Sequence, residues 1–293
     1  RVRGAFPGGL LCRSACQGEW PLAAPRFAHP IPESRRRNRV GLNQRFLNIF
    51  KWCGLVLISV FAGAGHAFAI LPIQNWQTSS GARVYFVENH QLPMLDVSIN
   101  FAAGSGRDTP AISGLANLTR HMLSLGADGL SEDEIAEKLA DVGAELGGHI
   151  DRDRAGITLR TLSNARERGQ ALDIMSRMVQ KPEFPEKVLD REKMRLVAML
   201  KEAATKPESI AERAFYSLLY GSHPYALRTS GEIDSVESLK RDDLVNFYRA
   251  YYTASDAVVA IIGDVNRETA QEIAEKLTAK LPEEAAPLPV LPQ

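Results

Sequence analysis

The sequence predicts an α+β fold, in which a mainly antiparallel sheet packs against amphipathic helices. Apolar and polar residues alternate over residues 95–101, which is the pattern of a half-buried strand. Helical spacing of apolar residues recurs along the rest of the chain without the regular β-α-β alternation of a doubly wound parallel sheet. No G-x-G-x-x-G phosphate loop follows a predicted strand, so a dinucleotide-binding fold is not indicated.

The strands are predicted from period-two patterns and short apolar runs. Residues 81–87 and 95–101 suggest an antiparallel pair joined by the polar turn 88–93. Gly147 and Gly148 precede a strand that runs through Ile157 and Leu159. A last buried strand is expected at residues 257–262.

The helices are predicted from 3.6-residue periodicity and from their end signals. Ser131 with Glu134 three residues later forms a capping box, and Pro185 suits the first turn of a long helix. Asn266 is the expected cap of the final helix. The predicted helices cover 113–123, the stretch after Ser131, 169–179, 185–204, 208–219, 241–252 and 266–281.

The first 69 residues have the composition of a targeting region. Two basic residues precede the apolar run 53–65, and Ala67-Phe68-Ala69 forms an A-x-A cleavage site. We therefore expect leader or untranslated sequence at 1–39 and a Sec-type signal peptide at 40–69, cleaved after Ala69. This predicts a periplasmic or secreted protein without a stable membrane anchor, and an uncleaved anchor is the alternative.

Removing that region changes the charge and the cysteine content. The remaining chain has 25 Lys and Arg against 33 Asp and Glu, a net charge of −8. It has no basic stripe, so nucleic acid is not an expected partner. Cys12, Cys16 and Cys53 all lie in the removed part, which leaves no disulfide and no Cys metal ligand. The Pro-rich stretch 282–293 reads as a linker to a missing second domain.

One segment carries the strongest functional signal. A Gly-Ser turn at Gly104 precedes the pair Gly114-Leu115 and the helix 117–121, which reads N-L-T-R-H. This frame resembles that of the pitrilysin/insulinase family of zinc peptidases, which carries an inverted H-x-x-E-H motif and is related to mitochondrial processing peptidase. Two His four residues apart lie on one helical face and can bind one Zn²⁺, while the Glu acts as general base.

The resemblance implies a degenerate motif in this chain. Asn117 stands at the first ligand, Arg120 at the catalytic Glu, and only His121 is retained. Arg is a permanent cation that neither accepts a proton nor tolerates a nearby Zn²⁺. The third ligand of the family, a Glu on a later helix, falls near Ala198 or Met199, neither of which suits zinc. We therefore expect no catalytic residue, no bound metal and no cofactor.

Further motifs of the family recur in order. His223-Pro224-Tyr225, the F-Y-x-x-Y-Y helix at 247–252 and the Gly-Asp-Val of 263–265 extend the resemblance over nearly all of residues 75–281. It implies that 70–281 is a pitrilysin-type amino-terminal domain, one half of a subunit whose two similar halves enclose a substrate chamber.

The leading hypothesis is an exported, catalytically inactive subunit. It would pair with an active zinc-binding subunit of the same family and help form a chamber for peptide or unfolded protein. One alternative is an active zinc metalloendopeptidase that uses His121 with Glu202 or His149. Another is a stand-alone peptide-binding scaffold. Weak candidates for substrate contact are the alternating charges Asp151, Arg152, Asp153 and Arg154, which follow the double Gly.

Overall fold

The computed structural model describes residues 72–283. The leader and signal peptide predicted at 1–39 and 40–69 lie outside the described residues, as does the linker from residue 284 onward. Within the described range no helix combines the length and the apolar character needed to cross a membrane.

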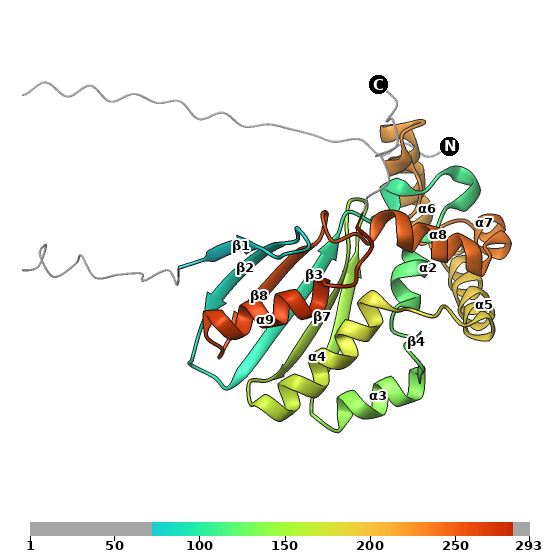
Figure 1. The fold of residues 1–293 in the computed structure, drawn as a ribbon. Coiled ribbons are helices and arrows are strands. Elements are labelled where there is room, and N and C mark those ends of the chain that lie inside the picture. The colour runs from blue at the N-terminus through green and yellow to red at the C-terminus, as the bar shows by residue number, and fades with distance from the viewer. Residues whose placement is uncertain (1–71, 284–293) are drawn as a thin grey trace, which may run out of the picture. The chain divides into compact units, whose positions relative to one another are not determined.

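Six strands form one sheet in the order β1-β2-β8-β3-β7-β6 (Figure 1). Only β2 and β8 run parallel, and the other neighbouring strands are antiparallel, so the predicted mainly antiparallel α+β architecture is confirmed. The strands are β1 (Gln74–Gln77), β2 (Arg83–Glu88), β3 (Met94–Phe101), β6 (Glu145–Ile150), β7 (Ala155–Leu162) and β8 (Val258–Gly263).

The predicted pairing of the two early strands is wrong. Strand β8 lies between β2 and β3, with Val259 opposite Val84 on one side and Ile99 on the other. The apolar strand β8 buries Val259 and Ile261 completely, which favours a central position in the sheet. The glycines 147 and 148 also lie inside β6 rather than before a strand, so β6 is an additional edge strand.

The helices follow the predicted segments closely. The capping box at the start of α3 is present, because the Ser131 hydroxyl accepts a hydrogen bond from Glu134 N and the Glu134 carboxylate accepts one from Ser131 N. A short helix, α7, was not predicted. The helices are α2 (Leu115–Met122), α3 (Glu132–Ala140), α4 (Ala165–Gln180), α5 (Glu186–Ala203), α6 (Pro207–Tyr220), α7 (Ile233–Ser238), α8 (Arg241–Tyr251) and α9 (Arg267–Thr278).

One face of the sheet carries the main hydrophobic core. Helices α4 and α9 lie across this face, while α2, α5, α6, α7 and α8 gather beyond one end of the sheet (Figure 1). Alternate residues of β2 and β3 point into the core and are fully buried, among them Phe86, Leu95 and Ile99. The opposite face leaves Tyr85 and Ile262 partly exposed.

Helix α6 differs from the others because it buries no residue. It nevertheless carries large apolar side chains that are more than half exposed, namely Ile210, Phe215, Leu218 and Leu219. An amphipathic helix in a complete domain normally covers its apolar stripe. This surface, the α6 apolar face, is therefore a feature that the packing within residues 72–283 does not explain.

Candidate functional site

Helix α2 carries the motif residues, and a buried carboxylate fixes its start. Asp108 accepts hydrogen bonds from Gly114 N at 2.8 Å and from Ala116 N at 3.1 Å, which satisfies amides that the first helical turn leaves free. Asp108 is 2% exposed. Burial raises the pKa of its carboxyl to about 7, against the opposing effect of the two amide hydrogen bonds.

Gly114 explains why a Gly-Leu pair begins this helix. It has φ +94°, a left-handed conformation that L side chains rarely adopt. A Cβ there would also lie 3.0 Å from the Cα of Gly231, on the segment that precedes α7. The pair Gly114 and Gly231 therefore lets two backbone segments approach closely and sets the position of α2.

The three motif residues lie together on the side of α2 that faces α5. Asn117, Arg120 and His121 line a cavity of about 230 Å³ with Met199 of α5, which we call the motif cavity. The other side of α2 packs into the core through Leu115 and Met122. The helical spacing thus brings the motif residues together as the sequence predicts. Of the two positions proposed for the third ligand, Met199 lines this cavity and Ala198 does not.

A carboxylate that the sequence does not predict as a site residue lies against His121. The Nε2 atom of His121 is 3.0 Å from Oε2 of Glu192, a residue of α5 that is 5% exposed. Arg191 donates from Nε to Glu192 Oε1 at 2.8 Å and from Nη2 to Glu132 of α3 at 2.6 Å. A chain of polar contacts therefore joins α2, α5 and α3 at the motif cavity.

The partners of Glu192 keep it ionised. Burial acts to raise its pKa, but the hydrogen bonds from Arg191 and His121 and their charges outweigh burial, so the pKa of Glu192 lies below the usual value. A signal for this residue was present in the sequence, because Glu192 precedes Met199 by two helical turns and so shares its face of α5.

Arg120 occupies the position of the family's catalytic Glu and lies against the sheet. Its Nε donates weakly to the carbonyl oxygen of Gly156 on β7, at 3.4 Å. A Cβ on Gly148 of β6 would collide with the Arg120 guanidinium, so this contact needs a glycine there. Burial lowers the pKa of Arg120, which nonetheless remains a cation at neutral pH.

These side chains do not fit a catalytic zinc ion. Such an ion needs three protein ligands around one open position. The motif cavity supplies one imidazole already bonded to Glu192, the amide of Asn117, the thioether of Met199 and the cation of Arg120. Across residues 72–283 no cluster of three or more His, Cys, Asp or Glu side chains is arranged to hold a metal ion.

The alternative ligands are not brought to His121. The carboxylate of Glu202 pairs with Lys206 at 2.7 Å, and neither residue lines the motif cavity. His149 lies exposed on β6 with its ring near Gly156. His223 caps a short helical turn by accepting a hydrogen bond from Tyr225 N, as expected for a structural residue.

The charged loop after β6, residues 151–154, is fixed by backbone hydrogen bonds to the Gly-Ser turn. The amides of Gly104, Ser105 and Gly106 donate to the carbonyl oxygens of Asp153, Asp151 and Arg152 respectively, at 2.7–3.2 Å. This gives the Gly-Ser turn a structural role. The carboxylate of Asp151 accepts hydrogen bonds from the amides of Asp153 and Arg154, and the phenol of Tyr225 donates to Asp153.

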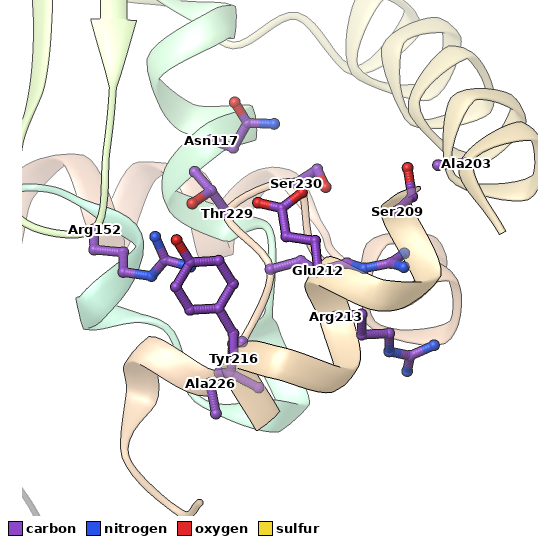
Figure 2. Close-up of a pocket in the computed structure, with 12 residues that line it drawn as sticks. Asn117, Arg152, Ala203, Ser209, Glu212, Arg213, Tyr216, Ala226, Thr229 and Ser230 are labelled. Atoms are coloured by element: carbon purple, nitrogen blue, oxygen red, sulfur yellow. The ribbon is translucent and has the colours of Figure 1, made fainter. Parts of the chain in front are cut away.

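Arg152, one of the four loop candidates, turns into a cavity. Its guanidinium lies 4.0 Å from the centroid of the Tyr216 ring, and its Nε donates to the carbonyl oxygen of Tyr225 at 3.2 Å (Figure 2). Asp151 and Arg154 form an exposed ion pair. The cavity, which we call the arginine cavity, has a volume of about 360 Å³ and is lined in part by Asn117, Arg152, Glu212, Arg213, Tyr216 and Arg228.

Comparison with known proteins identifies the family. Residues 83–232 match the family model described as insulinase (peptidase family M16), and residues 238–293 match the model described as the peptidase M16 inactive domain. The chain is 25% identical over 223 residues to "Probable mitochondrial-processing peptidase subunit beta, mitochondrial" of Arabidopsis thaliana, covering 76% of this chain and 41% of that protein.

Two further relatives extend the comparison. The chain is 24% identical over 182 residues to "Non-peptidase homolog YmxG" of Helicobacter pylori, covering 62% of this chain and 42% of that protein. A solved peptidase M16 inactive domain from Pseudomonas fluorescens is 36% identical, with a TM-score of 0.72 over 74% of this chain and 52% of that one. The chain spans about half the length of these relatives. It belongs to the insulinase family of peptidases, M16, which includes the pitrilysin-type enzymes that its motifs resemble.

Proposed function

We propose that this chain is a catalytically inactive M16 subunit, or half-subunit, that holds peptide beside an active zinc-binding partner of the same family. The observation that carries the proposal is the position of Arg120. A fixed cation stands where the family's general base belongs, and the adjacent His121 is already engaged by Glu192. The Helicobacter pylori relative, whose name is that of a non-peptidase homologue, agrees with this interpretation.

The pairing part of the proposal is supported by the α6 apolar face. Ile210, Phe215, Leu218 and Leu219 of this one helix are 51–87% exposed, and a concentration of exposed apolar side chains commonly marks a protein interface. The chain also spans only about half the length of its relatives. We propose that a second M16 half, in the same or another chain, covers this face.

The peptide-holding part is supported by strand β6. Within residues 72–283 it lies at the end of the sheet and pairs only with β7, so its other edge can add an extended segment as a further strand. The same edge favours the second candidate function, a stand-alone peptide-binding scaffold. We further propose export to the periplasm or beyond, which rests on the segment 40–69 alone.

Co-expression with an M16 protein that carries an intact H-x-x-E-H motif, encoded beside this chain, tests the pairing. Adding the chain should raise the partner's cleavage of an unfolded peptide, on the order of tenfold, with a stable complex on gel filtration. A Leu218→Asp, Leu219→Asp variant should lose both effects, whereas Asp substitution of the exposed Tyr85 on the sheet should not. If the chain forms no complex and leaves cleavage unchanged, the pairing is wrong and the scaffold function is favoured.

A further inference from the structure

The two cavities around Asn117 have an unusual concentration of guanidinium groups. Asn117 lines both the motif cavity and the arginine cavity, so the two adjoin. Five arginines line them, although the chain after residue 69 is acidic overall. They are Arg120 and Arg195 in the motif cavity and Arg152, Arg213 and Arg228 in the arginine cavity.

Most of these positive charges are not neutralised locally. Arg213 pairs with Glu232 at 3.0 Å, and Figure 2 shows its side chain directed away from Asn117. Within the described part of the chain, Arg120, Arg152 and Arg228 have no carboxylate within 4.0 Å. The other charged groups of the two cavities are Arg195, 3.8 Å from Glu192, the Glu192 carboxylate, which contacts His121, and the carboxylate of Glu212.

Arg120 and Arg152 are both held close to β6. Arg120 lies over Gly148 and the carbonyl of Gly156, and Arg152 follows β6 by two residues and stacks on Tyr216. Neighbouring strands are about 4.8 Å apart. A peptide strand added to β6 would therefore run near the guanidinium of Arg120, which lies over Gly148 of β6, and near the loop that carries Arg152. The preferred partners of guanidiniums are carboxylates.

We infer that the degenerate catalytic site binds acidic peptide. Arg120 and Arg152 bind Asp or Glu side chains of an extended segment that pairs with β6. This inference rests on the proposed peptide-holding function and names its substrate class. The half-buried Arg120 gains from a carboxylate because burial has already removed part of its hydration. Glu212 disfavours a second acidic group at its side of the arginine cavity, so the preference is for spaced rather than consecutive acidic residues.

Fluorescence anisotropy with the full chain and a pair of labelled peptides tests the inference. The peptides are about ten residues long, rich in Thr and Ser, blocked at both termini, and carry Glu or Gln at the same alternate positions. The Glu peptide should bind roughly tenfold more tightly than the Gln peptide. Arg120→Gln and Arg152→Gln should each remove most of this preference, Arg120→Lys should restore part of it, and the exposed Arg166→Gln on α4 should leave it unchanged.

The outcomes separate this inference from the function on which it rests. Equal binding of the Glu and Gln peptides would overturn the acidic preference while the peptide-holding function stands. Binding of neither peptide would overturn both, and the pairing with a zinc subunit would still be decided by the cleavage assay. Displacement of the Glu peptide by inorganic phosphate at equal concentration would overturn the inference in favour of a small-anion site. An unchanged preference in both Arg variants would also overturn it.

Discussion

His121 Nε2 lies 3.0 Å from Glu192 Oε2, and this contact joins α2 to α5 at the place where the family's zinc motif would act. Because Glu192 is 5% exposed and also bonded to Arg191, it is a buried charge with compensating partners. We interpret the pair as the element that fixes the two helices relative to each other in this chain.

Replacing Glu192 by Gln should therefore destabilise the protein. The variant loses a charge-assisted contact with both His121 and Arg191, which corresponds to about 1.5–3 kcal/mol. For a domain of this size the melting temperature should fall by roughly 3–10 °C. The matched control is Glu202→Gln on the same helix, whose solvent-exposed ion pair with Lys206 should contribute little to stability. Equal effects of the two variants would contradict the role of Glu192.

The buried Asp108 predicts an unusual pH dependence of stability. Its pKa is about 7 in the folded protein against 3.8 in the unfolded chain, so the unfolded state binds fewer protons between these values and stability falls as pH rises. The contribution is at most about 4 kcal/mol. Asp108→Asn should cost stability at pH 5, and its deficit should shrink between pH 5 and 8 in urea unfolding. A deficit that stays constant over this range would contradict the raised pKa.

Gly114 and Gly169 provide a matched pair of glycines. Gly114→Ala forces a side chain into a left-handed backbone at φ +94° and against Gly231, so it should destabilise by about 1–3 kcal/mol. Gly169 lies inside α4 with open space around it, so Gly169→Ala should stabilise the folded protein by about 0.5–1 kcal/mol. Chemical denaturation measures both changes in the free energy of unfolding. A Gly114→Ala variant as stable as the wild type would show that the close approach of Gly114 and Gly231 does not constrain α2.

The geometry of the motif cavity also predicts how zinc binding could be restored. A triple variant, Asn117→His, Arg120→Glu and Met199→Glu, should bind zinc in a chelator competition assay, because all three positions and His121 line one cavity. The same variant with Ala198→Glu in place of Met199→Glu should not, because Ala198 lies outside that cavity. Equal zinc binding by the two variants would contradict the assignment of Met199 as the third-ligand position.

The sequence predicted the helices better than the sheet. Local signals define helices, as Ser131 and Glu134 do for α3 and Asn266 for α9. The place of β8 between β2 and β3 depends on residues more than 150 positions apart and leaves no local trace. Strand β6 was missed because Gly147 and Gly148 suggest a turn.

The candidate site was predicted in outline and not in its contacts. The motif frame identified Asn117, Arg120 and His121, and the structure places them in one cavity. Glu192 was missed because its spacing from the motif differs from that of the family's third ligand, although it lies two helical turns before Met199 on the same face of α5. Arg152 was only a weak candidate from the sequence, but in the structure it lines a cavity and stacks on Tyr216. The sequence could not predict this contact because it joins distant segments.

Metal analysis of the purified full-length protein, combined with a cleavage assay on an unfolded peptide, tests the central claim most directly. We predict no stoichiometric zinc and no cleavage by the chain alone, because Arg120 replaces the general base and Glu192 engages His121. Zinc bound at one ion per chain, together with cleavage that a chelator abolishes and added zinc restores, would contradict the account.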